Sequence, residues 1–386
     1  MPDRSRRSHK WVTEEFYKVH DVYGFRAAMF VEWGFRPADV KRTTERIKVP
    51  EAASKEWART AAQEEALARE AEAAGHRESA AEFYHRAALY YGPACGMIHA
   101  NTPKKRELYA KMVACYTKFT ELFGEAPVQR VEIPFEGGKT IPGILQTVPG
   151  VKAPCVLVGP GMDTIKEYMP NPYHNPFRRR GLATLSIDGP GQGESNVRET
   201  WVTLDNFERA GSAAIDFLEK RPELDASRVG LYGWSMGSYW GPRVAAHDPR
   251  LKACVGAMGV YLQKDTIFQH GKPAYRANYM YMSNVHDEDA FDEMAARMTL
   301  EPLAPKLRCP MLLAMGEFDE LCPLEDAERL YGMIPGPKEL WVYENETHTL
   351  GGRLPDFYLL VADWLRDALD GKLKPGHARK RFFPAR

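Results

Sequence analysis

A serine between two glycines is the residue of this 386-residue chain best placed to do chemistry. Gly233, Ser235 and Gly237 form the pattern G-x-S-x-G, which is typical of a tight turn that presents a strained serine hydroxyl between a strand and a helix. Residues 228–233 predict the strand, and residues 236–246 predict the helix. Side chains two residues either side of the serine would clash, which explains the glycines. An ordinary glycine turn is the alternative, but this context favours a nucleophile.

An acid and a base that could activate this serine follow it along the chain. A predicted buried strand at residues 310–316 precedes Asp319, and the predicted last strand at residues 338–343 precedes His348. A histidine can take the proton of an attacking hydroxyl, and an aspartate can orient the histidine and stabilise its charged form. We therefore predict the catalytic triad Ser235, Asp319 and His348. A surface histidine is the alternative for His348.

Backbone N–H groups near Ser235 are expected to stabilise the negative charge that develops on a carbonyl oxygen under attack. One donor is the residue after the nucleophile, Met236. The other comes from the loop after the predicted strand at residues 154–159, where the candidates are Met162 and Gly161. A backbone donor needs no particular side chain, so both candidates stay open.

Aromatic and polar residues gather in two stretches that could line a substrate pocket. Residues 165–180 are broken by prolines, and residues 260–302 form an excursion rich in Tyr and Met between two predicted strands. Such aromatic stripes are also typical of a core, so both interpretations stay open. The candidate substrate contacts are Tyr168, His174, Trp234, Asp265 and Tyr279.

Two regions with different sequence patterns must position these residues. Residues 1–124 carry helical spacing without a strand signal, and we expect helices near 13–33, 51–74, 79–91 (ended by Pro93) and 104–123. Residues 125–370 open with a predicted hairpin and then alternate strands with helices, which predicts an α/β fold with a mostly parallel sheet. Residues 371–386 predict a solvated basic tail. The helical region could cover Ser235 as a cap or simply pack beside it.

A glycine-rich turn follows the predicted strand at residues 181–188. Residues 188–195 read D-G-P-G-Q-G-E-S, and we predict a structural role in which Asp188 and Ser195 bond nearby N–H groups. A phosphate-binding loop is the alternative. The turn has neither the following Lys-Ser/Thr of a P-loop nor the G-x-G-x-x-G spacing of a dinucleotide site.

Composition narrows the remaining classes of function. Lys plus Arg number 52, as do Asp plus Glu, so the balance argues against a nucleic-acid partner. Six cysteines show no metal-binding spacing and predict free thiols in a reducing compartment. The basic start leads into no apolar run. We therefore expect a cytoplasmic protein without a metal and without a membrane partner.

The combination of these motifs resembles one branch of the α/β-hydrolases. This branch includes 2,6-dihydroxypseudooxynicotine hydrolase, the FrsA-like esterases and the fungal yellowish-green polyketide-shortening hydrolases. The resemblance rests on a helical N-terminal third together with three motifs: G-M-D-T-I-K-E at residues 161–167, the turn D-G-P-G-Q-G-E-S, and G-W-S-M-G-S. The resemblance implies an α/β-hydrolase fold with a helical N-terminal cap, the triad above, no metal or cofactor, and a homodimer.

The resemblance also implies the reaction. Members of this branch hydrolyse small carbonyl compounds, at a carbon–carbon bond beside a ketone or at an ester. We expect a serine hydrolase that cleaves a carbon–carbon bond in an aryl or polyketide-like substrate. A carboxylesterase or amidase, and a non-catalytic binding protein on a hydrolase scaffold, are the alternatives.

Overall fold

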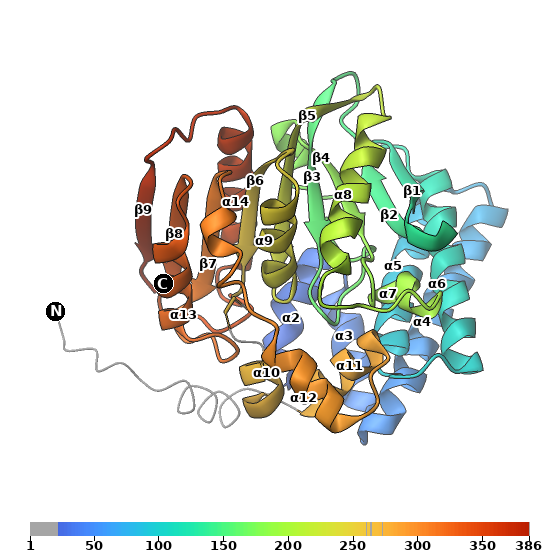
Figure 1. Cartoon of the computed structure of the whole chain (residues 1–386). Coiled ribbons are helices and arrows are strands. Elements are labelled where there is room, and N and C mark those ends of the chain that lie inside the picture. Colours follow the sequence, from blue (N-terminus) through green and yellow to red (C-terminus); the bar gives the residue numbers. More distant parts are fainter. Residues whose placement is uncertain (1–21, 260, 263–264, 272, 386) are drawn as a thin grey trace.

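The computed structural model describes residues 22–259, 261–262, 265–271 and 273–385. Within them one sheet of nine strands has the order β1-β2-β4-β3-β5-β6-β7-β8-β9 (Figure 1). The strands are β1 (Val128–Pro134), β2 (Thr140–Gln146), β3 (Ala153–Gly159), β4 (Ala183–Ile187), β5 (Leu224–Trp234), β6 (Leu251–Ala257), β7 (Met311–Gly316), β8 (Lys338–Tyr343) and β9 (Ala378–Phe383).

The sheet is parallel except at its first edge. β1 and β2 form an antiparallel hairpin, and β2 runs antiparallel to β4. From β4 to β9 every neighbouring pair is parallel. The central strands β3, β4 and β7 are buried along their whole length, as expected for continuous apolar runs covered on both faces. The expected α/β-hydrolase fold, with a mostly parallel sheet, is confirmed.

Helices cover both faces of the sheet and form two apolar cores. On one face, α8 (Asn206–Glu219), α9 (Gly237–His247) and α13 (Leu324–Met333) contribute to one core cluster. On the other face, α14 (Leu354–Leu369) shares its cluster with the N-terminal helices. The short helix α7 (Gly193–Val197) follows the glycine-rich turn. Single 3₁₀ turns lie at Pro50–Ala52, Glu136–Gly138, Arg178–Arg180 and Ala304–Lys306.

The described part of the N-terminal region is helical up to the first strand. It contains α2 (Val22–Trp33), α3 (Pro37–Arg46), α4 (Ala53–Ala73), α5 (Arg77–Gly96) and α6 (Pro103–Leu122). The start of the predicted helix at 13–33 lies outside the described residues. The prediction that Pro93 ends a helix is wrong, because α5 continues through it to Gly96. A proline this close to the end of a helix removes only one backbone hydrogen bond, and the buried residues around it keep the last turn in place.

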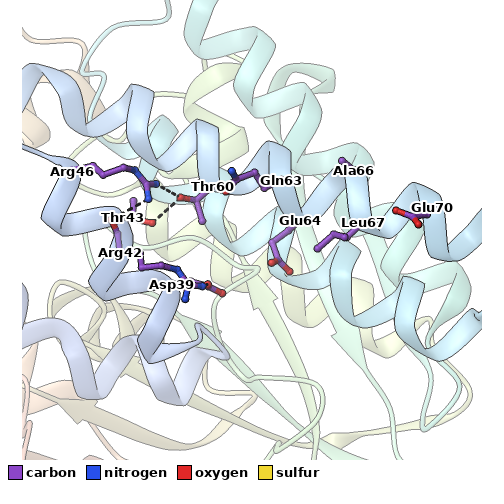
Figure 2. A pocket seen from close by; sticks show the side chains of 10 residues that line it. All are labelled: Asp39, Arg42, Thr43, Arg46, Thr60, Gln63, Glu64, Ala66, Leu67 and Glu70. Atoms are coloured by element: carbon purple, nitrogen blue, oxygen red, sulfur yellow. Dashed lines mark hydrogen bonds and ion pairs between the residues drawn. The ribbon is translucent and has the colours of Figure 1, made fainter.

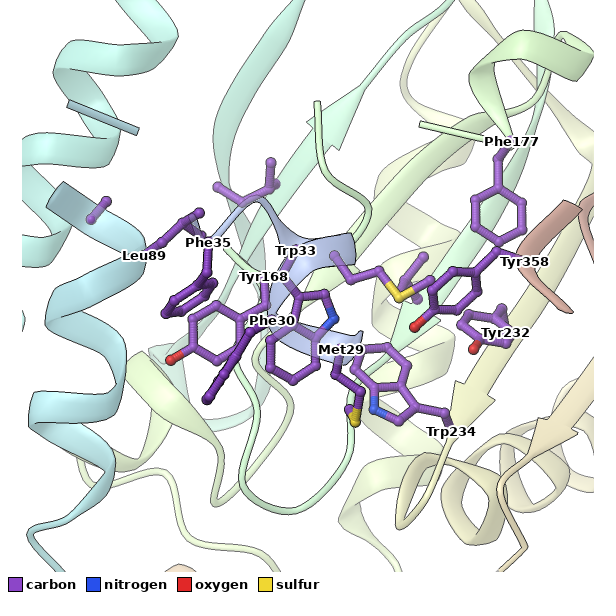
Figure 3. Close-up of a cluster of buried hydrophobic side chains, with 14 of the residues drawn as sticks. Met29, Phe30, Trp33, Phe35, Leu89, Tyr168, Phe177, Tyr232, Trp234 and Tyr358 are labelled. Carbon is purple, nitrogen blue, oxygen red and sulfur yellow. The ribbon is translucent and has the colours of Figure 1, made fainter. Parts of the chain in front are cut away.

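Aromatic side chains join the N-terminal helices to the loop that follows β3. The Trp33 ring of α2 stacks on Tyr168 at 4.7 Å between centroids, and Phe35 meets the same ring edge-on. Figure 3 shows Met29 and Trp33 between Tyr168 on one side and Trp234 on the other. One core cluster therefore runs from the helices to the residue that precedes Ser235.

The excursion after β6 forms three helices at the same end of the molecule as the N-terminal helices (Figure 1). They are α10 (Asp265–His270), α11 (Pro273–Ser283) and α12 (Glu288–Ala296). A hydrogen bond of 2.7 Å from the Tyr281 hydroxyl to Asn101 Oδ1 ties α11 to the segment before α6. The excursion and the helical region therefore meet. No helix among the described residues is long and apolar enough to cross a membrane.

The C-terminal residues are mostly exposed, as predicted for a solvated tail, but part of them forms a strand that the sequence did not predict. β9 (Ala378–Phe383) pairs in parallel with β8 along six positions and closes the far edge of the sheet. Phe383 stacks on Tyr343 at 4.4 Å, and the Arg381 guanidinium lies over Trp341 at 5.1 Å. Ladder hydrogen bonds and these cross-strand pairs hold the segment in the sheet.

Candidate active site

The backbone turn at Ser235 joins the end of β5 to the start of α9. Ser235 has φ of +53°, a conformation that residues other than glycine rarely adopt. A Cβ on Gly233 would lie 2.2 Å from the Gly237 carbonyl oxygen, so this glycine permits the turn itself. A Cβ on Gly237 would lie 2.2 Å from the Gly159 carbonyl oxygen, so this glycine permits α9 to approach β3. The two glycines therefore relieve different clashes.

Ser235, His348 and Asp319 come together at the carboxyl ends of β5, β8 and β7. The Ser235 hydroxyl lies 2.9 Å from His348 Nε2, and His348 Nδ1 lies 2.9 Å and 3.0 Å from the two Asp319 oxygens. An ionised carboxylate can only accept, so His348 Nδ1 carries a proton and Nε2 is left to accept from the serine. This arrangement can move the serine proton to the imidazole while the carboxylate holds the ring.

Buried charges set the proton affinity of His348. Burial lowers its pKa, but the charge of Asp319 and the hydrogen bond to that carboxylate outweigh burial, so the pKa is raised above its usual value. Asp319 Oδ1 also accepts from the backbone N–H groups of Leu321 and Cys322 at 2.9 Å and 3.1 Å. Three donors therefore hold a fully buried carboxylate that faces the histidine.

A second carboxylate, Glu320, supports the histidine loop from behind. Its Oε2 accepts from the backbone N–H of His348 at 3.0 Å, and the residue is 1% exposed. Burial raises the pKa of Glu320 to about 7, with the Asp319 charge adding to the rise and His348 opposing it. The structure gives Glu320 a contact to the backbone of the base rather than to its ring.

The loop after β3 lies against Ser235 and is held by the glycine-rich turn. A Cβ on Gly161 would lie 3.2 Å from Ser235 Cβ, and Met162 lines the same cavity as Ser235 and Met236. In the described part of the chain, the N–H groups of Met162 and Met236 have no backbone acceptor. The Gln192 amide donates to the carbonyls of Pro160 and Gly161 at 3.2 Å and 2.9 Å, which fixes the loop.

Buried charges anchor the same loop further along. Lys166 Nζ lies 2.8 Å from Glu167, 2.9 Å from Asp188 and 2.9 Å from Glu194, and Arg130 also bonds Glu194 at 2.9 Å. The loop after β3 is thereby tied to the turn after β4. The prediction that this turn is structural fits these contacts, but the Ser195 hydroxyl donates to the Asp188 carbonyl at 2.6 Å instead of accepting from an N–H group.

A small cavity of about 50 Å³ opens beside the Ser235 hydroxyl. Its walls come from α2, the loop after β3, the turn at Ser235, the excursion and the histidine loop. The lining residues include Met29, Trp33, Met162, Trp234, Met258, Ile267, Tyr275, Leu321 and Thr349. A mostly apolar wall excludes water from the reacting atoms and strengthens hydrogen bonds to developing charge.

A larger side cavity of about 250 Å³ adjoins the first. Both cavities are lined by Trp33, Met162, Asp163 and Tyr275, so they meet at these four residues. The side cavity continues between α5, the start of α6 and α11. Together the two spaces approach the lower end of the size range of ligand pockets, about 300 Å³.

The predicted substrate residues divide between these cavities and other places. Trp234 lines the small cavity and Tyr168 lines the side cavity. His174 is exposed and lines neither, and Tyr279 packs in the core against Phe268 at 5.2 Å, so the structure places neither of them in these two cavities. His174 faces solvent, and the ring of Tyr279 belongs to the apolar core beside α11. Asp265 begins α10, and its side chain lies outside the described residues.

Several cavity residues were missed by the sequence analysis. Met29 and Trp33 belong to a helix without a chemical motif, and Lys105 belongs to the first turn of α6. The helical spacing in these segments indicated that one face of each helix is buried, but it did not indicate which part of the protein contacts that face. Met258 follows β6 with φ of +54°, a strained backbone conformation that the sequence of this segment does not reveal.

Another hollow lies on the helical region, and no member of the triad lines it. It measures about 470 Å³ and runs along α3 and α4. Figure 2 shows Thr60 linking Arg46 and Thr43, with bonds of 2.7 Å to each. The hollow is lined mainly by charged and polar residues and contains no member of the triad. Its contacts are those of a solvated helix–helix junction.

Comparisons with known proteins find relatives that are named hydrolases. A family model described as "Esterase FrsA-like" matches residues 52–331. Hydrolase ORFZ of Pyricularia oryzae is 34% identical over 238 residues, 57% of this chain and 55% of that protein. The 2,6-dihydropseudooxynicotine hydrolase of Paenarthrobacter nicotinovorans is 28% identical over 319 residues, 81% of this chain and 83% of that protein.

The solved structures extend the likeness to the whole fold. The crystal structure of 2,6-dihydroxy-pseudo-oxynicotine hydrolase superposes with a TM-score of 0.79 at 25% identity, covering 91% of this chain and 98% of that chain. The matches to the fungal relatives span only about half the length of those proteins. The matched share is 55% of hydrolase ORFZ and 51% of the alpha/beta hydrolase xenA of Xenoacremonium sinensis. Their activities as whole proteins are therefore not transferred from these matches.

Proposed function

Because the chain belongs to the FrsA-like esterase family of α/β-hydrolases, we propose that it is a serine hydrolase that uses Ser235, His348 and Asp319. The observation that carries the proposal is the chain of hydrogen bonds from Ser235 through His348 to Asp319, with 2.9 Å at each step, beside a cavity. In the proposed reaction His348 Nε2 takes the hydroxyl proton as Ser235 Oγ attacks a carbonyl carbon. Asp319 stabilises the imidazolium that forms.

The oxyanion of the tetrahedral intermediate would accept hydrogen bonds from backbone N–H groups. We assign this role to Met236 and Met162, with Gly161 as the alternative to Met162. Both methionines line the cavity that holds the Ser235 hydroxyl, and Gln192 restrains the loop that carries Met162. Preformed donors of this kind act without reorganising during the reaction, which is why they lower the barrier.

We further propose that the bond cleaved is a carbon–carbon bond beside a ketone in an aryl or polyketide-like substrate. Collapse of the intermediate breaks that bond, and its electron pair moves onto a second carbonyl or an electron-rich ring as an enolate. His348 then gives its proton to the leaving carbon. Water, deprotonated by His348, attacks the acyl group on Ser235 and releases a carboxylic acid and the free serine. An aromatic-walled side cavity beside the triad suits the leaving ring.

The second candidate reaction is hydrolysis of an ester or amide by the same residues, which the family name favours. The test compares kcat/KM for an aryl β-diketone and for an ester with the same acyl group, across several acyl groups. Carbon–carbon cleavage predicts turnover of the diketone at a rate comparable to the ester. Fast ester hydrolysis with no reaction of any diketone would show an esterase and exclude the carbon–carbon reaction.

The proposal also covers the state of the protein in the cell. All six cysteines are free and five are buried, which supports a reducing, cytoplasmic compartment. The homodimer is proposed from the family resemblance alone. Light scattering on the purified full chain measures the mass directly, and a monomer at micromolar concentration would remove the dimer from the proposal.

A further inference from the structure

Lys105 is a buried cation whose described surroundings provide no anion. The residue is 4% exposed, and its Nζ donates to the Ile98 carbonyl at 2.6 Å and lies 4.1 Å from the centroid of the Tyr281 ring. Burial lowers its pKa to about 8, and the Cys95 thiol opposes this fall. Burial raises the pKa of Cys95 to about 12, so this thiol is neutral. Within the described residues Lys105 therefore has a carbonyl and a ring as partners, but no carboxylate.

This position is electrostatically unfavourable in two ways. A buried charge without a partner is unfavourable because it has lost its hydration, and a paired anion would offset part of that cost. Lys105 also lies in the first turn of α6, directly after the Thr102 cap, where the positive end of the helix repels a cation. Both effects would become favourable if a negative group entered beside Lys105. A group brought by a ligand would supply it.

The side cavity gives such a group a place and a direction. Lys105 lines this cavity together with the rings of Tyr109, His99 and Tyr281. Asp163 lines both the side cavity and the cavity of Ser235, whereas Lys105 lines the side cavity alone, and the charge of Asp163 raises the pKa of His348. The space is therefore polarised, with its positive part away from the triad and its negative part beside it.

We propose that the side cavity binds an anionic oxygen group, a carboxylate or an ionised phenol or enol, with Lys105 as its counter-ion. The group would belong to the end of the substrate that is remote from the bond cleaved, and a flat ring between the two ends would lie among the aromatic walls. This inference rests on the proposed function in one respect, that the ligand is the substrate of Ser235. The binding of an anion by Lys105 can be measured without catalysis.

The experiment measures binding by calorimetry to the full-length protein and to three variants. The probes are phenylbutanoate, its neutral isostere phenylbutanamide, and dinitrophenolate as the phenolate arm. The variants are Lys105→Met, Lys105→Arg and the matched control Lys104→Met, whose side chain is 61% exposed one residue away. Thermal unfolding of each variant shows that it is folded.

We expect at least one anion to bind the wild type roughly tenfold or more tightly than the amide, since a close charge pair out of water contributes about 1.4 kcal/mol or more. Lys105→Met should abolish that preference, while Lys105→Arg and Lys104→Met retain it. Which anion binds distinguishes a carboxylate from a phenolate. An equal affinity for anion and amide, or a preference that survives in Lys105→Met, would overturn the proposal. Labelling of Ser235 by a fluorophosphonate is measured separately, so failure of the hydrolase proposal is distinguishable from failure of this one.

Discussion

Replacing Lys166 by methionine should destabilise the protein and disturb the loop beside Ser235 together. The Lys166 ammonium touches three carboxylates, those of Glu167, Asp188 and Glu194, at 2.8 to 2.9 Å. The side chains of Lys166, Glu167 and Asp188 are fully buried and that of Glu194 is 8% exposed, so water cannot replace the lost charge. Arg130 remains, but it reaches only two of the three carboxylates.

The size of the expected destabilisation follows from the loss of one buried cation among three carboxylates. Removing one partner of a buried ion pair costs about 3–5 kcal/mol, because it leaves the other charge uncompensated. At about 2 °C per kcal/mol, the lower end for large domains, the midpoint of thermal unfolding should fall by roughly 6–10 °C. The loop after β3 would also loosen. Loss of one oxyanion donor costs about 10²–10³ in kcat, so we expect a displaced donor to lower kcat by about 10- to 100-fold.

The stability of the Lys166→Met variant should also depend on pH in a direction that a simple packing defect would not produce. Burial raises the pKa of Glu194, but Lys166 and Arg130 outweigh burial and hold it at about 2. This value is below the unfolded value of about 4.3, so the wild type gains stability that is present above pH about 4.3 and lost toward pH 2. Burial already raises the pKa of Glu167 and Lys166 opposes that rise, so without Lys166 its folded pKa should lie further above the unfolded value. The variant should then regain stability as the pH falls from 7 toward 5.

The assay is calorimetric unfolding of wild type and variant at pH 7 and pH 5, with kcat measured on an aryl ester. Lys118→Met is the control, because its ion pair with Glu72 is partly exposed to water and should contribute little to stability. A variant that unfolds within about 1 °C of the wild type at pH 7 and keeps its kcat would refute the reasoning. A deficit that does not shrink at pH 5 would refute the charge argument alone.

Three other predictions follow from the site. Gln192→Ala should lower kcat with little change in KM, because its amide fixes the two carbonyls of the loop that carries Met162; steady-state kinetics with an unchanged kcat would contradict this. Glu320→Gln should move the acid limb of the kcat/KM profile to lower pH, because the charge of Glu320 raises the pKa of His348 and the base must be neutral to act; an unmoved limb would exclude that coupling. A chain that begins at residue 125 should expose the apolar surface that the helices now cover and aggregate; a soluble truncated protein with unchanged substrate selectivity would contradict the role of the helical region as a cap.

The sequence predicts best where the constraint is local. The turn at Ser235 is recognisable because Gly233 and Gly237 are required by clashes within a few residues or with the adjoining strand. Asp319 and His348 were identifiable because each follows a short buried strand, and the carboxyl ends of parallel strands lie at one edge of a sheet. The fold class followed from the same alternation of strands and helices.

The rest depends on contacts between distant segments. Lys105 contacts the ring of Tyr281, which lies far away in the sequence, and no residue spacing in either segment predicts that contact. β9 carries three basic residues in six positions and is a strand only because β8 and its aromatic rings are beside it. Tyr279 and Tyr275 lie in the same helix with similar sequence signals, yet one fills the core and the other lines both cavities. Tertiary packing decides such cases, and sequence patterns on one helix do not.

The most direct test of the central claim is covalent labelling with a fluorophosphonate, followed by mass spectrometry of the labelled peptide. The account predicts one modification, on Ser235, that is absent in Ser235→Ala. It predicts a labelling rate that falls by several orders of magnitude in Asp319→Asn, since that change misorients the base. A wild-type protein that does not label, labels at another residue, or labels equally fast in Asp319→Asn would contradict the account.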